Sequence, residues 1–338
     1  MKDKIIFIAL STLLLLTSCF KEDRPLVLPA SKAKVMSVFM GSEFQNQIFF
    51  KMEDQSYQTS NLNDWDLAFD NVSNQFKIVT NYGRNIFVAR TQALDVSQLE
   101  SIKPAQIPIK QWLYDFPNGS IDSNAFGDWK NLYGNKMPFH IIDMGRTLPS
   151  PQRYYVVRVL EADDVQYKVE FGKFSMLDSL QVVEIKRNKN RNFTYLNIRN
   201  GQIHTDFEPL KEDWDFVFTR YRFIFYIDPN PTEPLPYLVS GCLLNPHNVS
   251  VSLDTVSGFE NINLKLCNQK HFTKSQDVIG YAWKSFDYSV SFSYTINPNM
   301  VYIVKNNKGD FYKIRFLDFY NENKQTGYPK FQIQQVVN

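Results

Sequence analysis

The stretch Asp213-Trp-Asp-Phe-Val-Phe218 decides how this sequence is organised, because residues 64–69 repeat it as Asp-Trp-Asp-Leu-Ala-Phe. Four further landmarks keep the same order in both halves, and the partners lie 145 to 154 residues apart. They are a strand-like segment with a turn at 48–59 and 193–205, Trp-Lys at 129 and 283, Tyr-Val-Val-Arg at 155 matched by Tyr-Ile-Val-Lys at 302, and Tyr-Lys-Val-Glu-Phe at 167 matched by Tyr-Lys-Ile-Arg-Phe at 312. The pattern predicts a duplicated unit of about 150 residues. The alternative is chance similarity between aromatic-rich strands.

The amino terminus is typical of an export signal. A positively charged start and an apolar run over 5–16 predict a signal peptide at 1–18, since the run is too short to span a bilayer. The run ends in Leu-Thr-Ser-Cys, which resembles a bacterial lipobox and implies lipidation of Cys19. Phe-Lys-Glu-Asp follows at 20–23 and resembles the signal that sends some outer-membrane lipoproteins to the cell surface. Residues 19–33 are then expected to form a lipidated tether, and the acyl chains to be the only membrane attachment.

Composition favours a β-rich fold. The 338 residues contain 15% aromatic side chains and many short β-branched runs, whereas helical periodicity is scarce. We therefore expect an all-β protein with at most short helices, built as two tandem domains at 34–187 and 188–338. The formal charge falls from +2 to +1 once residues 1–18 are removed. A nearly neutral chain argues against nucleic acid as a partner.

Catalytic patterns are hard to find. The carboxylates that flank each Trp share one strand face, but Asp around a core Trp is more typical of backbone hydrogen bonding at a strand start. The sequence contains no nucleophile elbow, dinucleotide-binding or phosphate-loop motif, and its four histidines have no zinc-type spacing. We expect no enzyme. Cys242 and Cys267 could form a disulfide that closes a loop of about 25 residues and contributes ~3 kcal/mol, or could remain free.

Several segments resemble the HmuY family of haem-binding outer-membrane lipoproteins. The two Asp-Trp-Asp phrases, with Thr-Arg-Tyr after the second, are similar to the family's Asp-Trp-Asp-hydrophobic-x-Phe-x-Arg-Tyr strand. Thr-Asn-Tyr-Gly at 80–83 resembles its Thr-Asn-x-Gly turn. The carboxyl end matches best, over 302–305, 309–316 and 327–331. The resemblance implies two diverged copies of an all-β domain that holds haem between loops and passes it to a TonB-dependent receptor for iron uptake.

Family members hold the haem iron with a pair of His or Met side chains, and imidazole and thioether are both good haem ligands. The resemblance places the ligand-bearing loops at 83–153 and 222–300. The first window offers Met137, His140 and Met144 as ligand candidates, beside Trp129 and Tyr133 as an aromatic wall. The second offers His271, whereas His247 lies in a turn-like sequence between Pro and Asn. No metal other than haem iron is expected. The alternative for Met137 and Met144 is ordinary packing, for His140 a position in a surface loop or the core, and for His271 a solvated position.

Two function classes follow. The first is a haem-binding lipoprotein anchored at the outer membrane and exposed on the cell surface. The second is a non-enzymatic surface adhesin or assembly subunit that kept the fold and lost the iron ligands, and it predicts an exposed aromatic patch.

Overall fold

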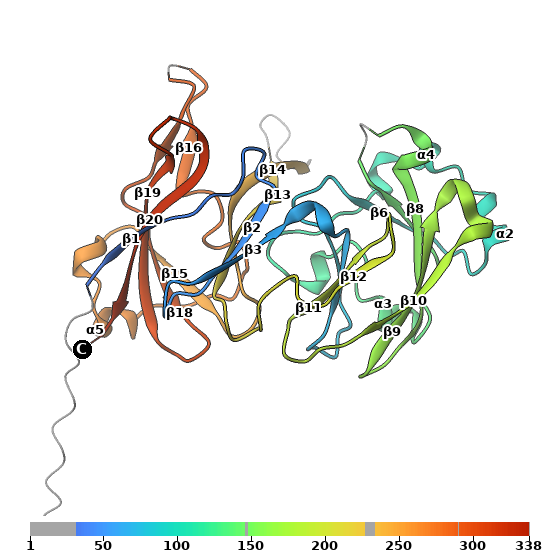
Figure 1. Ribbon diagram of the computed structural model, residues 1–338, viewed down its shortest axis with the longest axis horizontal. Coiled ribbons are helices and arrows are strands. Elements are labelled where there is room, and N and C mark those ends of the chain that lie inside the picture. Colours follow the sequence, from blue (N-terminus) through green and yellow to red (C-terminus); the bar gives the residue numbers. More distant parts are fainter. Residues whose placement is uncertain (1–31, 146–147, 227–233, 290, 338) are drawn as a thin grey trace, which may run out of the picture.

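The protein is an elongated stack of four antiparallel β-sheets, seen in a computed structural model that describes residues 32–145, 148–226, 234–289 and 291–337 (Figure 1). The sheets form two sandwiches whose inner sheets pack against each other. The signal peptide at 1–18, Cys19 and the tether up to residue 31 lie outside the described residues. No helix in the described ranges is long and apolar enough to cross a membrane.

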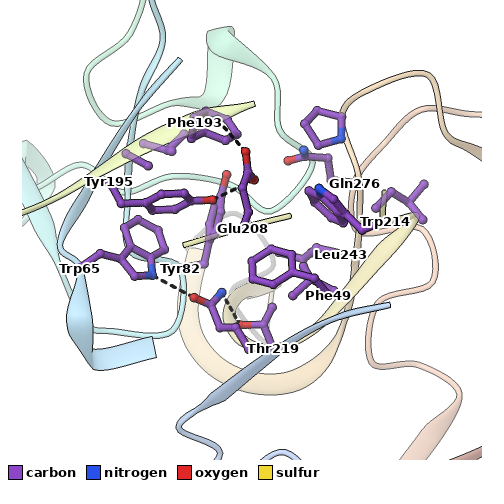
Figure 2. Close-up of a pocket in the computed structure, with 16 residues that line it drawn as sticks. Phe49, Trp65, Tyr82, Phe193, Tyr195, Glu208, Trp214, Thr219, Leu243 and Gln276 are labelled. Atoms are coloured by element: carbon purple, nitrogen blue, oxygen red, sulfur yellow. Dashed lines mark hydrogen bonds between the residues drawn. The ribbon is translucent and has the colours of Figure 1, made fainter. Parts of the chain in front are cut away.

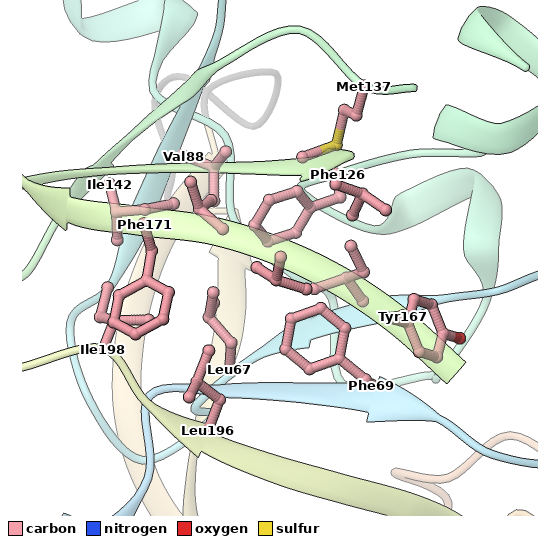
Figure 3. Close-up of a cluster of buried hydrophobic side chains, with 14 of the residues drawn as sticks. Leu67, Phe69, Val88, Phe126, Met137, Ile142, Tyr167, Phe171, Leu196 and Ile198 are labelled. Atoms are coloured by element: carbon pink, nitrogen blue, oxygen red, sulfur yellow. The ribbon is translucent and has the colours of Figure 1, made fainter. Parts of the chain in front are cut away.

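The first sandwich buries one apolar core between an outer and an inner sheet. Its outer sheet has the order β10 (Gln181–Lys186), β9 (Gln166–Lys173), β8 (Tyr154–Ala162), β7 (His140–Asp143) and β6 (Phe87–Arg90). Its inner sheet has the order β12 (Gln202–His204), β11 (Phe193–Asn197), β4 (Leu67–Asp70) and β5 (Ile78–Thr80). Figure 3 shows the core, in which Leu67 and Phe69 of β4 meet Phe171 and Ile142 of the outer sheet.

The second sandwich repeats this arrangement around its own core. Its outer sheet has the order β1 (Lys34–Ser37), β20 (Thr326–Val336), β19 (Phe311–Tyr320), β18 (Val301–Lys305) and β15 (Ser250–Asp254). Its inner sheet has the order β14 (Pro234–Leu244), β13 (Phe216–Tyr226), β2 (Asn46–Phe50) and β3 (Tyr57–Asn61). A small two-stranded sheet, β16 (Lys284–Phe286) and β17 (Tyr294–Ile296), projects from it.

Helices are short, so the predicted all-β class is confirmed. The α-helices are α2 (Val96–Glu100), α3 (Trp129–Tyr133), α4 (Ser150–Arg153) and α5 (Leu264–Cys267). The 3-10 turns are η2 (Leu62–Asp64), η3 (Pro104–Gln106), η4 (Ile109–Gln111), η5 (Ile121–Ser123), η6 (Phe174–Ser179) and η7 (Phe259–Asn261). Helix α2 begins after Asp95 because that carboxylate accepts a hydrogen bond from the Gln98 backbone N–H.

Sequence patterns distinguish the inner sheets from the outer ones. Strands β4 and β11 are buried at every position and read as continuous apolar or small-residue runs, because each has a core on both faces. The outer strand β9 alternates between buried and half-buried residues along most of its length, because one face meets solvent. The apolar side chains that face away from the two cores form a third cluster between the inner sheets, which we call the joint.

The two halves exchange a hairpin. Hairpin β2–β3 precedes the first Asp-Trp-Asp phrase in the chain, yet β2 pairs with β13 after the second phrase. Hairpin β11–β12 precedes the second phrase, yet β11 pairs with β4 after the first. Strand β1, near the amino terminus, likewise pairs with β20 near the carboxyl terminus. The division at 187 and 188 remains a prediction about the copied unit, whereas the sheets themselves are built across it.

The repeat is visible in hydrogen bonds as well as in sequence. The Asn81 side chain donates to the Trp65 carbonyl at 2.8 Å, and the Asn245 side chain donates to the Trp214 carbonyl at 2.7 Å. Each asparagine also donates its backbone N–H, to Asp66 and Asp215 respectively. Trp65 and Trp214 therefore occupy equivalent places, as the sequence repeat predicts.

One strand prediction is wrong over most of its length. The alternating segment 288–296 predicts one strand, but only Tyr294–Ile296 is extended and paired, as β17. The cause is Asp287, whose carboxylate accepts hydrogen bonds from the backbone N–H groups of Ser289 and Ser291 and so holds a loop. The hairpin turn predicted at 306–309 is confirmed between β18 and β19.

Candidate functional site

The predicted haem ligands of the first half lie in the first sandwich and not in an open slot. Met137 and Met144 belong to the apolar core, and His140 is fully buried on β7. Figure 3 shows Met137 beside the ring of Phe126. The His140 ring stacks on Phe126 at 5.8 Å and 6°, and the edge of Tyr133 meets it at 6.2 Å. This is the packing alternative that the sequence left open.

The His140 ring is enclosed on all sides by neighbouring groups of the protein. Neither ring nitrogen has a hydrogen-bond partner among the described residues, and burial lowers the pKa of the imidazole to about 4. The ring is therefore neutral at physiological pH and holds a lone pair suited to iron. Haem could reach it only if the core around Phe126 opened.

The predicted aromatic wall belongs to the same core, whereas the two histidines of the second half lie elsewhere. Trp129 is buried and donates its indole N–H to the Phe76 carbonyl at 2.8 Å, while Tyr133 is half-buried at the core edge. His271 is exposed in the second sandwich. His247 lies in a turn, where its backbone N–H donates to Asn245.

The possible disulfide is not formed. Cys242 and Cys267 are both buried free thiols, and they belong to different apolar clusters. Burial raises the pKa of both thiols, so they are poor nucleophiles. No group of three His, Cys, Asp or Glu side chains in the described ranges is arranged to hold a metal ion.

A cleft of about 340 Å³ lies at the end of the first sandwich that is far from β1 (Figure 1). The loop before η3, helix α4, the start of β8 and the start of η6 form its walls. Its size is within the range of small-molecule sites. The lining residues are mostly apolar, with one lysine, one tyrosine and two serines as polar members: Ile102, Lys103, Pro104, Ala105, Ser150, Pro151, Tyr154, Phe174 and Ser175.

Tyr154 is held firmly at the cleft. Its ring stacks on Trp112 at 6.0 Å and 21°, and the Arg153 guanidinium lies 4.9 Å from the ring centroid. Arg153 is itself fixed by two hydrogen bonds to Asp143, at 2.9 and 2.6 Å. Met176, directly after the lining Ser175, is the exposed methionine of the described chain, with 53% of its surface accessible.

Six of the nine lining residues fall in the 83–153 window expected to carry ligand-bearing loops. The sequence could not single out Tyr154 or the 102–105 loop, because these residues have no distinctive spacing and meet only in the folded chain.

The joint encloses a second, smaller void of about 40 Å³. Figure 2 shows aromatic side chains from both inner sheets around it, including Trp65, Tyr82, Tyr195, Phe49 and Trp214. Glu208 is fully buried at its edge, and burial raises the pKa of its carboxyl to about 7. The void is too small for a porphyrin.

Comparison with known proteins gives one family match. Residues 245–333 match the family described as HmuY protein. No curated protein matches the chain. This segment contains β15, β18, β19 and most of β20, which form the outer sheet of the second sandwich with β1, and also the small sheet of β16 and β17.

Solved structures are similar only at a distance. Apo PinO from Porphyromonas gingivitis has 10% identity and a TM-score of 0.29, with 90% of this chain and 97% of that chain covered. The Apo HmuY analog of Tannerella forsythia has 10% identity and a TM-score of 0.27, with 93% and 100% covered. A putative HmuY-like heme binding protein from Bacteroides vulgatus ATCC 8482 has 10% identity and a TM-score of 0.25, with 91% and 96% covered. These likenesses are too distant to carry an argument, and the similarity to the HmuY protein family rests on residues 245–333.

Proposed function

We propose that this chain is a non-enzymatic, lipid-anchored haem-binding protein. The observation that carries the proposal is the HmuY family match over 245–333. The lipobox-like sequence at 16–19 supports the anchor.

The cleft at the end of the first sandwich is the haem site of this proposal. A porphyrin is flat and apolar with two carboxylates, so it needs apolar walls and a nearby cation. Ile102, Pro104 and Phe174 supply apolar wall, and the Lys103 ammonium can pair with a propionate.

Two side chains at the cleft have chemistry that haem iron accepts. A tyrosine phenolate and a methionine thioether are both known axial ligands. Tyr154 lines the cleft, and the exposed Met176 directly follows the lining residue Ser175 in the chain. Met137, His140 and Met144 do not fit the role in this conformation, because packed side chains surround them.

The direct test is a haem titration of the purified chain followed by its Soret band. We expect a saturable band that shifts in Tyr154→Phe and in Met176→Leu, because each change removes one iron donor. Met137→Leu is the matched control for Met176→Leu and should leave the band unchanged. A spectrum altered by Met137→Leu and untouched by the two cleft changes would move the site into the core.

Cell-surface exposure and delivery of haem to a TonB-dependent outer-membrane receptor are part of the same proposal. Residue 32 and β1 lie at one end of the molecule and the cleft lies near the other (Figure 1). An anchor at Cys19 would therefore leave the cleft facing away from the lipid. Cys19→Ser should release the chain from the outer-membrane fraction, and intact wild-type cells should lose it to added protease.

A second candidate function is adhesion, and one observation favours it. Large aromatic side chains are exposed on the projecting parts of the second sandwich, from 55% to 73% of their surface: Tyr226, Tyr237, Tyr288 and Phe292. Such side chains favour contact with protein or glycan. Adhesion predicts binding to host glycans or proteins that Tyr288→Ser abolishes, with no Soret band in any variant.

A further inference from the structure

The joint breaks the symmetry of the repeat at one hydrogen bond. The indole N–H of Trp65 donates to the Gln47 side chain at 2.9 Å. Trp214 is the equivalent tryptophan, and its indole nitrogen is buried with no hydrogen-bond partner among the residues that the structure describes. The strand pairing explains the difference. β2 occupies the place of β11, so Gln47 corresponds to Phe193, which has no side-chain acceptor.

The remainder of the surroundings keeps the repeat. Tyr195 meets Trp65 edge-on at 5.0 Å and 78°, and Phe49 meets Trp214 edge-on at 5.1 Å and 81°. Trp214 is only 4% exposed. The indole N–H of Trp214 is therefore an unpaired donor among the described residues, and it is enclosed by aromatic side chains and not at the surface.

The void beside Trp214 is of a size that holds water. Its volume of about 40 Å³ exceeds the roughly 10–15 Å³ that one water requires. Polar atoms are available around it. Trp214, Glu208 and Gln276 all line the void (Figure 2). Buried water generally occupies such places when two or more polar partners converge.

Glu208 is the titratable group of this void. One carboxyl oxygen accepts the Phe193 backbone N–H at 2.8 Å, and the other lies 3.0 Å from the Tyr195 hydroxyl. Arg191 favours the charged carboxylate, while the nearby Tyr82 and Tyr195 bring no positive charge. Burial outweighs Arg191 and raises the pKa to about 7. The group is 1% exposed, so its ionisation places a charge inside the joint.

We propose that the void is a water-binding site shared by the Trp214 indole and the Glu208 carboxyl, and that the protonation of Glu208 sets how tightly the two inner sheets close on it. With a neutral carboxyl, a bound water satisfies Trp214 and the sheets stay closed. A carboxylate needs more hydration than the void holds, so its formation loosens the sheets locally. The exchanged hairpins keep the sandwiches together, which confines the change to the joint.

The test uses indole NMR on the chain from residue 19 with Cys19→Ser, so that no lipid is attached. We expect the Trp214 indole proton to show a cross-peak to a long-lived water and its shift to titrate near neutral pH. The Trp65 indole proton is the internal control and should titrate far less, because Gln47 already accepts it.

Two variants separate the parts of the proposal. Glu208→Gln should abolish the titration of the Trp214 signal and keep the water cross-peak. Phe193→Gln supplies the partner that Trp65 has, so it should remove the water cross-peak, and an unchanged Trp65 signal would report an intact fold. A dry void in the wild-type chain, or a Trp214 signal that still titrates in Glu208→Gln, would overturn the proposal. If Phe193→Gln unfolds the chain, the wild-type cross-peak and Glu208→Gln still decide it.

Discussion

Asp66 and Asp215 perform the same task at equivalent places in the two inner sheets. The Asp66 carboxylate accepts the backbone N–H of Ile198 at 3.0 Å, and the Asp215 carboxylate accepts that of Met52 at 2.7 Å. Each of these N–H groups follows the first strand of the exchanged hairpin, so each carboxylate fastens a hairpin supplied by the other half of the chain. The second carboxylate of each Asp-Trp-Asp phrase therefore has a structural role, because it binds the backbone of the exchanged hairpin.

The exchange predicts that neither half folds alone. Residues 34–187 would lack β11 for β4, and residues 188–338 would lack β2 for β13. Each fragment would also expose one face of the joint. Expressed separately, both fragments should show no cooperative urea transition, and expressed together they should form a one-to-one complex. Cooperative unfolding of either fragment by itself would contradict the exchange.

Asp66 should matter more to stability than Asp215. Asp66 also receives Arg84 at 2.9 Å and Arg199 at 3.1 Å, so Asp66→Asn leaves two guanidinium groups without their carboxylate. We expect a loss of about 3 kcal/mol in the free energy of unfolding for Asp66→Asn. For Asp215→Asn we expect a loss of about 1 kcal/mol in the free energy of unfolding, because the hydrogen bond from the Met52 backbone N–H weakens.

The exposed Asp64 is the matched control for both changes, and Asp64→Asn should alter stability by less than about 0.5 kcal/mol. Urea unfolding at pH 7.5 measures all three. Equal losses of unfolding free energy for Asp64→Asn and Asp66→Asn would show that the burial and ion pairing of Asp66 do not contribute to stability.

Glu208 predicts a pH dependence with a definite sign. The pKa of its carboxyl is raised from 4.5 to about 7 in the folded chain, so folding favours the protonated form. Its contribution is fully present below pH 4.5 and is lost as the pH rises through 7, by about 3 kcal/mol in total. The difference in unfolding free energy between wild type and Glu208→Gln should therefore shrink or reverse between pH 5 and 8. A difference that is constant over this range would contradict the raised pKa.

The thiols predict a simple chemical result. With Cys19→Ser, the folded chain should react with a thiol reagent very slowly, because Cys242 and Cys267 are fully buried. In denaturant both thiols should react without any reducing agent. A denatured, unreduced chain with no reactive thiol would mean that a disulfide does form.

The sequence predicts the repeat, the β class and the equivalent tryptophans, because each phrase has the same local partners in both copies. It cannot predict the exchange. Hairpins 46–61 and 193–204 have similar sequence patterns. The sequence therefore gives no reason for one of them, and not the other, to pair with β4 or with β13. Which hairpin pairs with which strand depends on how the chain connects the two inner sheets across the joint.

The sequence could not show that the ligand candidates Met137 and His140 are enclosed by packing. Both are suitable iron donors by type, but Met137 lies in the apolar core, and His140 lies on β7, which is buried on both faces. The cleft is assembled from segments about 70 residues apart, such as 102–105 and 174–175. The spacing of residues along the sequence does not indicate that these segments lie together in the folded chain.

The measurement that tests the proposed function most directly is a Soret titration of a chain whose cleft has been filled. Ala105 lines the cleft, and Ala105→Trp should occupy the space for the porphyrin. Val256 is 91% exposed, so Val256→Trp is the matched control. The account predicts that Ala105→Trp weakens haem binding at least tenfold while Val256→Trp binds as the wild type does. Equal haem affinity in all three chains, or no Soret band in the wild type, would contradict it.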